Sequence, residues 1–111
     1  MISALGAVTV PTPGTPVRAT INRADPSKPI PCHGIMFEAL PANTGFVYIG
    51  QQNMNRSTLE GVYAVIPVPS TNILPSFSTA LTLAPNGLGA HLFWVDADNP
   101  TDGVLVTFLQ L

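Results

Sequence analysis

The chain has 111 residues, a length that fits one domain with a single two-layer core. Only 9% of the residues are charged, against about 25% in typical soluble domains, and the net charge is −2. Four basic residues do not supply the cationic surface that nucleic-acid binding requires, and no apolar run reaches the ~18 residues of a membrane span.

Twelve prolines and nine glycines are spread along the chain, and they exclude long helices because proline inside a helix removes a hydrogen bond. Short runs of alternating apolar and polar residues predict strands instead. In the first half of the chain we expect strands at 4–10, 17–21, 33–40 and 46–49, with turns or loops at 11–16, 25–29 and 41–45. Two of these strands have a clear apolar face, formed by Val17, Ala19 and Ile21 in one and by Ile35, Phe37 and Ala39 in the other.

The second half continues with an amide-rich stretch at 50–57, which we interpret as a loop. Further strands are expected at 61–68, 77–84, 91–95 and 104–111, separated by a loop at 69–75, a turn at 85–87 and a turn-rich loop at 96–103. The last strand is apolar at nearly every position, so we expect it to be central, sandwiched or used in an interface.

About eight short strands predict an all-β fold, an antiparallel β-sandwich of jelly-roll or Greek-key type, with an up-and-down barrel as the alternative. Residues 1–16 form a candidate N-terminal arm, and residues 17–111 form the single sandwich domain. The start of the chain lacks the cationic residues of a secretory signal, so we expect synthesis in a cytoplasm.

The inventory of catalytic side chains is small. Cys32 and His33 are neighbours, but adjacent strand residues point to opposite faces, so the histidine is poorly placed to activate the thiol. A zinc site built on these two residues and His91 lacks a fourth ligand at a suitable spacing. Glu38 and Glu60 stand alone among apolar strand residues. We therefore expect no enzymatic activity, no catalytic residues and no cofactor.

The loop at 96–103 carries three carboxylates, those of Asp96, Asp98 and Asp102. Calcium takes six to eight oxygen ligands from such loops, so these residues are a candidate calcium site. The EF-hand pattern fails, because Pro100 occupies a ligand position and no distal glutamate follows. The alternative is a hairpin loop in which the side chains bond the local backbone, and this interpretation leaves no metal site.

Several residues are candidates for an interface. Phe93 and Trp94 are adjacent on an expected strand, so one of them faces outward and either anchors an interface or stacks on a sugar. Val8, Val10 and Pro11 lie in the candidate arm, which, if free, would pair with the sheet edge of a neighbouring molecule. The low charge points the same way, because the centres of protein interfaces are depleted of charged residues. A merely charge-poor monomer is the alternative.

Residues 39–50 read ALPANTGFVYIG, and residues 94–97 read WVDA before a glycine-containing turn and a closing apolar strand at 103–111. In order and spacing these phrases resemble small β-sandwich virion proteins of tailed bacteriophages, including capsid decoration (cement) proteins. The match covers about the C-terminal two-thirds of the chain, and the opening segment is also similar. The chain departs from the pattern in a longer, proline-rich stretch at 67–75.

This resemblance implies a non-enzymatic structural protein of the virion, with capsid decoration as the first expectation. The implied partners are the major capsid protein or another virion protein and further copies of the chain, with a trimer favoured. A tail, spike-base or head–tail component is one alternative. A carbohydrate- or receptor-binding module, using Trp94 with Asp96 and Asp98, is another. Neither nucleic acid nor a membrane is an expected partner.

Overall fold

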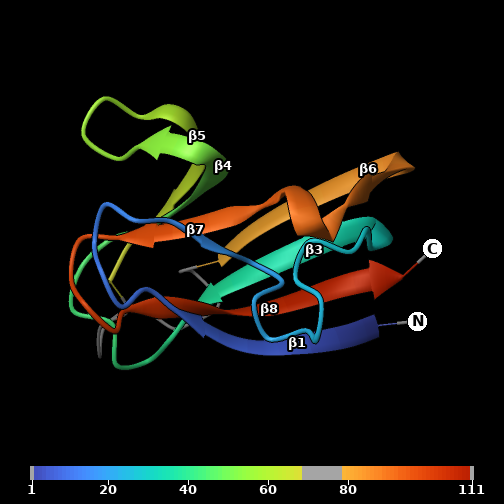
Figure 1. Cartoon of the computed structure of the whole chain (residues 1–111), viewed down its shortest axis with the longest axis horizontal. Coiled ribbons are helices and arrows are strands. Elements are labelled where there is room, and N and C mark those ends of the chain that lie inside the picture. Colours follow the sequence, from blue (N-terminus) through green and yellow to red (C-terminus); the bar gives the residue numbers. More distant parts are fainter. Residues whose placement is uncertain (1, 69–78, 111) are drawn as a thin grey trace.

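The computed structural model describes residues 2–68 and 79–110. This part of the chain folds into two antiparallel sheets that pack face to face, with a short 3-10 helix at Ala90–Leu92 (Figure 1). The strands are β1 (Ile2–Thr9), β2 (Val17–Arg18), β3 (Pro31–Ala39), β4 (Val47–Asn55), β5 (Glu60–Ile66), β6 (Thr79–Gly89), β7 (Trp94–Ala97) and β8 (Gly103–Gln110). None of the described helical residues forms a segment long and apolar enough to cross a bilayer.

The order of the strands identifies the topology. The first sheet runs β1-β8-β3-β6 and the second runs β2-β7-β4-β5. The first half of the chain therefore pairs with the second half in reverse order: β1 with β8, β2 with β7, β3 with β6 and β4 with β5. This nested pairing is that of an eight-stranded jelly roll. The prediction of an all-β antiparallel sandwich of this type is confirmed.

Alternate residues of each strand fill the space between the sheets. In β3, Ile35, Phe37 and Ala39 are buried, as the two-residue period predicted. Their partners across the ladder are Phe108, Val106 and Val104 of β8, which are also buried. The second sheet contributes residues that include Val47, Ile49, Ile66, Val95 and Ala97.

Strand β8 is central in the first sheet, between β1 and β3, as its apolar sequence predicted. Only one of its faces is in the core. Leu105 and Leu109 point outward and are each 40% exposed. The mostly apolar sequence of this strand therefore serves both the core and an apolar outer surface.

The N-terminal segment is part of the sandwich. Strand β1 pairs with β8 from Ile2 opposite Leu109 to Thr9 opposite Gly103. Val8 and Val10 are fully buried in the core. The hypothesis of a free arm is therefore wrong for these residues, because β8 needs β1 as its second neighbour and the core needs the two valines.

Two other predicted segments differ in length from those observed. The strand expected at 17–21 pairs only at Val17–Arg18, after which two tight turns follow and Ile21 is exposed. Conversely, β4 continues to Asn55 through the amide-rich stretch that we interpreted as a loop. Its ladder with β5 is irregular there: Gly50 pairs with Val62, but the next pair is Asn55 with Glu60. Extra residues on β4 therefore bulge outward, which explains their polar composition.

The last departures concern β6 and β7. The turn expected at 85–87 lies inside β6, in an irregular stretch between the pairs Gly34–Leu83 and Cys32–Leu88. The strand expected to begin at His91 begins at Trp94, because the 3-10 helix occupies the preceding residues. The loop predicted at 69–75 and the start of the strand predicted at 77–84 lie outside the described residues.

Candidate interaction surfaces

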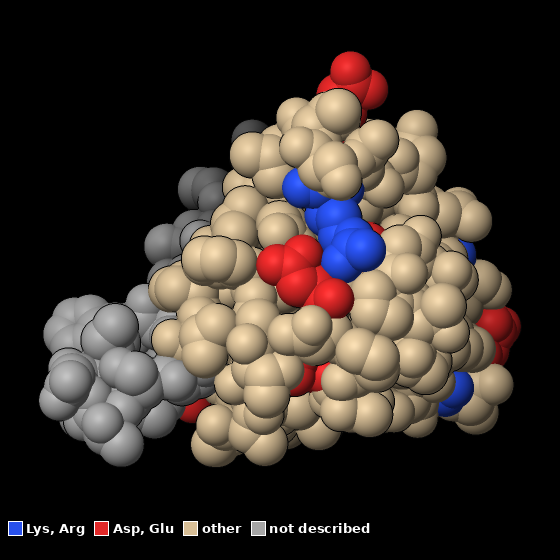
Figure 2. Space-filling model, turned by 90° about the vertical axis from the view of Figure 1, so that its left-hand side faces the viewer, with Lys and Arg blue, Asp and Glu red and all other residues tan. Residues whose placement is uncertain are grey.

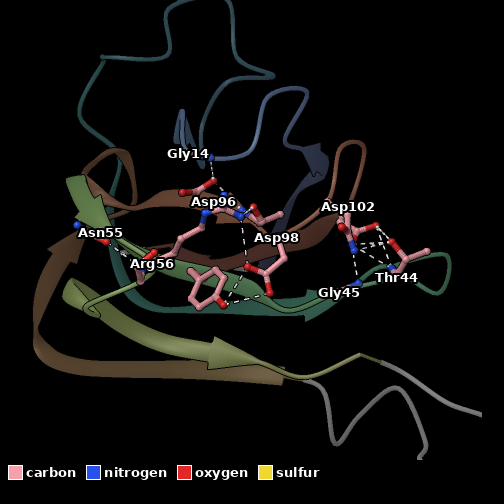
Figure 3. A network of polar contacts seen from close by, with 12 residues as sticks. Gly14, Thr44, Gly45, Asn55, Arg56, Asp96, Asp98 and Asp102 are labelled. Atoms are coloured by element: carbon pink, nitrogen blue, oxygen red, sulfur yellow. Dashed lines mark hydrogen bonds and ion pairs between the residues drawn. The ribbon is translucent and has the colours of Figure 1, made fainter.

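One end of the sandwich, at the left in Figure 1, is formed by three loops that join the two sheets and by the tip of the β4–β5 hairpin of the second sheet. The segments 10–16, 40–46, 55–60 and 97–103 meet there. Figure 2 views this end directly and shows a mostly uncharged surface on which basic and acidic side chains touch near the centre. A network of polar contacts lies beneath it (Figure 3).

Asp102 is the most heavily hydrogen-bonded carboxylate of this end. It is 3% exposed and accepts the backbone N–H of Thr44 at 3.0 Å and that of Gly45 at 2.8 Å. The hydroxyl of Thr44 lies 3.3 Å from both carboxylate oxygens. Successive N–H groups that converge on one anion form a strong, charge-assisted arrangement. Asp102 thus ties the loop before β4 to the loop before β8.

Asn43 makes a second tie between the same two loops. Its side-chain amide donates to the carbonyl of Gly103 at 2.8 Å, and its side-chain oxygen accepts the N–H of Gly103 at 2.9 Å. The side-chain amide of Asn43 therefore pairs with the backbone of Gly103 in the way that the backbone of a neighbouring strand would, although Asn43 lies in a loop. Gly103 itself has no room for a side chain, because a Cβ there would lie 2.0 Å from the carbonyl oxygen of Val8.

Asp98 belongs to a separate cluster nearer the surface. It accepts a hydrogen bond from the hydroxyl of Tyr48 at 3.1 Å and forms an ion pair with Arg56 at 3.3 Å. The Arg56 guanidinium also donates to the carbonyl of Ala97 at 2.8 Å. Burial raises the pKa of the Tyr48 hydroxyl, and the hydrogen bond to the Asp98 carboxylate raises it further.

Asp96 lies beneath the loop at 10–16. It is 1% exposed, and its Oδ1 accepts the N–H of Gly14 at 2.9 Å and that of Ala97 at 2.8 Å. The three aspartates thus bond to three different sets of partners. Within residues 2–68 and 79–110 no three acidic, histidine or cysteine side chains converge as metal ligands. The structure does not bring Asp96, Asp98 and Asp102 together as the calcium hypothesis requires, and their carboxylates bond to loop backbone, Tyr48 and Arg56.

The other candidate chemical groups are also dispersed. Cys32 is buried, and burial raises the pKa of its thiol, which disfavours the reactive thiolate. His33 is exposed on the opposite side of β3, whereas His91 accepts the N–H of Ile30 at 3.3 Å. Glu38 is half-buried on β3 and Glu60 is exposed at the start of β5, in different sheets. The structure therefore does not bring the Cys32 thiol together with the His33 ring, or the carboxylate of Glu38 together with that of Glu60.

The predicted interface residues divide into two groups. Phe93 is buried against Phe37, with ring centroids 5.6 Å apart, and Val8 and Val10 belong to the core. These three are not interface residues, because they face the inside of the sandwich. Pro11 is exposed, and Trp94 is half-buried on the outer face of the second sheet. The guanidinium of Arg18 lies 4.7 Å from the centroid of the Trp94 ring, so one ring face is covered.

A surface that the sequence interpretation missed is the outer face of the first sheet. Across the ladders, Ala7 pairs with Leu105 and Leu105 with Glu38, while Ala4 pairs with Thr107 and Thr107 with Met36. Ala4, Ala7, Leu105 and Leu109 are exposed, and Glu38 is the one charged residue in these two rows. Solvent-facing sheet faces normally carry polar residues in alternation with the core. The signal was the mostly apolar sequence of β8, which had left a core position and an interface position both open.

No protein-family model matches the chain, and neither a curated protein nor a solved structure matches it.

Proposed function

We propose that this protein is a non-enzymatic structural component of a bacteriophage particle, and that it decorates the outside of the capsid. The observation that supports an assembly role best is the apolar outer face of the first sheet, formed by Ala4, Ala7, Met36, Leu105 and Leu109, on a chain that is only 9% charged. The jelly-roll topology agrees with this role by analogy alone, since the same fold also builds lectins and enzymes.

The mechanism is mechanical. Each copy lays its apolar sheet face against the major capsid protein and bridges neighbouring subunits, with threefold positions of the shell favouring a trimer. Burying the exposed part of Leu105 and of Leu109 contributes about 1 kcal/mol each, since full burial of a leucine is worth about 1.5–3 kcal/mol. Many such contacts per shell add up to a stabilised head.

A sugar-binding role has less support. Stacking on a sugar ring requires an open aromatic face, and Arg18 covers one face of Trp94. Of the carboxylates that were expected to assist, Asp98 is bonded to Arg56 and Tyr48, and Asp96 uses one of its two oxygens for the backbone. We therefore place the interaction on the sheet face and not at Trp94.

The test is binding of the purified protein to empty expanded heads of the phage that encodes it, counted as copies per head after sedimentation. We expect saturable binding that falls several-fold in the Leu105→Glu variant, because the substitution places a charge in the apolar face. Gln52→Glu is the matched control, since it adds the same charge at an exposed position of the second sheet.

Absence of binding to heads, with binding instead to isolated tails, would replace decoration by a tail role. Equal loss in both variants would mean that net charge, and not the sheet face, controls the interaction. Light scattering on the free protein adds a second check, because the proposal expects a trimer.

A further inference from the structure

A polar hollow opens between the tip of the β4–β5 hairpin, the loop at 10–16 and strand β7. Its volume is about 350 Å³, and it is lined by Gly14, Asn53, Met54, Asn55, Arg56, Ser57 and Asp96. Three of the seven lining side chains are neutral amide or hydroxyl groups, and two, those of Arg56 and Asp96, are charged. Asp96 is the acidic member of this lining, and only 1% of its surface is exposed.

Only one of the two oxygens of the buried Asp96 carboxylate accepts hydrogen bonds from the residues that the structure describes. Its Oδ1 accepts two backbone N–H groups, but its Oδ2 accepts no hydrogen bond from any residue that the structure describes (Figure 3). A buried carboxylate oxygen without a donor is costly, and proteins normally provide it with a partner. This oxygen is therefore an open acceptor position beside the hollow.

The negative charge of Asp96 is also unbalanced. Arg56 lines the same hollow, but its guanidinium donates to the carbonyl of Ala97 and pairs with Asp98. That ion pair is the one salt bridge found within residues 2–68 and 79–110. With Asp96, Asp98 and Arg56 counted together, the local charge is −1.

We propose that this hollow receives a basic side chain, lysine or arginine, from a partner protein. Its N–H groups would donate to Oδ2 of Asp96 and to the amide oxygens of the rim, and its aliphatic stem would lie along Met54. The inference rests on the proposed assembly role only for the source of this side chain. It makes the loop end a second contact site, one that uses polar chemistry, in addition to the apolar sheet face.

Other occupants fit less well. Several water molecules would fit in the hollow and could donate to Oδ2, but they would bring no positive charge to Asp96. A divalent cation such as calcium takes six to eight oxygen ligands, and no three acidic, histidine or cysteine side chains of the described residues come together. An anion would meet the charge of Asp96 in the lining, and the basic lining residue Arg56 is already paired with Asp98. A neutral sugar would leave the charge of Asp96 without a counterion.

The test uses the whole protein, labelled with nitrogen-15, and small probes in place of the partner. The amide signals of Gly14 and Ala97 report on the occupied hollow, since both N–H groups bond to Asp96. N-acetyl-arginine amide and N-acetyl-lysine amide are titrated, with N-acetyl-glutamine amide, calcium chloride and glucose as comparisons. We expect saturable shifts of these two signals with the basic probes only.

Two variants test whether the shifts of the amide signals depend on the Asp96 carboxylate. Asp96→Asn preserves the shape and should weaken the basic probes at least about tenfold, the loss expected for a charge-assisted hydrogen bond. Glu60→Gln removes one negative charge at an exposed residue of β5 that does not line the hollow, and it should leave binding within about twofold. If Asp96→Asn does not fold, Ser57→Tyr decides, because it narrows the mouth of the hollow from an exposed position.

Absence of saturable shifts with both basic probes, or stronger binding of calcium or glucose, overturns the inference. Basic probes that bind Glu60→Gln as weakly as Asp96→Asn also overturn it, because the overall surface charge would then be responsible. These results are independent of the binding to heads. Probes that bind, on a protein that does not attach to any head, would refute the decoration role and leave the hollow as a recognition site.

Discussion

Removal of the Asp102 carboxylate should be one of the most damaging single changes at the loop end of the molecule. In Asp102→Ala, the N–H groups of Thr44 and Gly45 lose their acceptor, as does the hydroxyl of Thr44. Hydrogen bonds to a charged group are each worth about 1.5–3 kcal/mol. Thr44 is exposed and Gly45 is half-buried, so water replaces part of what is lost. We expect the free energy of unfolding to fall by about 2–4 kcal/mol.

The assay is urea unfolding followed by the fluorescence of Trp94, together with a thermal scan. For a domain of this size a loss of that magnitude lowers Tm by about 10 °C. Asp102→Asn should lose roughly half as much, since it keeps one acceptor oxygen but turns an amide group toward two N–H donors. Asp98→Asn is the control, because its ion pair is 30% and 37% exposed and should contribute less than about 1 kcal/mol.

The reasoning would be refuted by an Asp102→Ala protein whose free energy of unfolding lies within about 0.5 kcal/mol of the parent, a difference typical of neutral surface changes. It would also fail if Asp98→Asn were the more destabilising variant. Either result would mean that water satisfies the two N–H groups as well as the carboxylate does.

Three further predictions concern close packing, the core and pH. Gly103→Ala should lower the free energy of unfolding, measured with urea, by several kcal/mol, because its Cβ would lie 2.0 Å from the carbonyl oxygen of Val8 and displace β1. A loss below about 1 kcal/mol would show that β1 is loosely held. Phe37→Ala should lower the free energy of unfolding by about 3–5 kcal/mol, since the ring is buried between the sheets against Phe93. A urea midpoint near that of the parent protein would contradict this packing. Burial raises the pKa of the Cys32 thiol and the Tyr48 hydroxyl, so the folded state holds both protons at a pH where the unfolded state has begun to release them. This contribution to the free energy of unfolding is fully present below the ordinary pKa values of 9.0 and 10.0, and it declines as the pH rises above them. Urea midpoints measured from pH 7 to 10.5 should therefore decline less steeply with pH in Tyr48→Phe than in the parent protein. Identical dependence on pH in the two proteins would exclude Tyr48 as a cause.

The strands of the core were predictable because their physical signal is local. The side chains of β3 alternate between core and surface with a period of two, so Ile35, Phe37 and Ala39 identified their own buried face. The central position of β8 followed from its apolar run in the same way. In each case the information lies within a few consecutive residues.

The extents of β2 and β4 were less predictable because they depend on neighbouring strands. Ala19 and Ile21 continue the alternation of Val17, but the chain turns after Arg18 and pairs with β7 only over two residues. The polar end of β4 resembles a loop in sequence, yet it remains in the ladder through its pair with Glu60. The free arm was wrong for the same reason, since the edge position beside β8 is visible only once the sheet order is known.

The contacts of the loop end were beyond local sequence analysis. Asp102 and Thr44 are 58 residues apart, and only the nested pairing of the jelly roll brings their loops together. What the sequence did contain was the chemistry of each half: an Asn-Thr-Gly segment with free N–H groups and an Asp-Gly turn with an acceptor. Of the two interpretations of the three aspartates, bonding to backbone groups is nearer to the structure than a calcium site, but the backbone partners of Asp96 and Asp102 include Gly14, Thr44 and Gly45, which are far away in sequence.

The phrases that carry the phage resemblance are largely architectural in this structure. Asn43, Thr44 and Gly45 of the first phrase bond directly to Asp102 and Gly103, in the glycine turn that follows the second. Each of the two loops crosses from one sheet to the other, so these bonds hold the sheets together at one end of the sandwich. Such phrases therefore carry information about the fold more than about a partner. Asp96 of the second phrase also lines the hollow at the loop end, and Leu105 of the closing strand lies on the apolar outer face, so the proposed contacts use these residues in addition to their place in the fold.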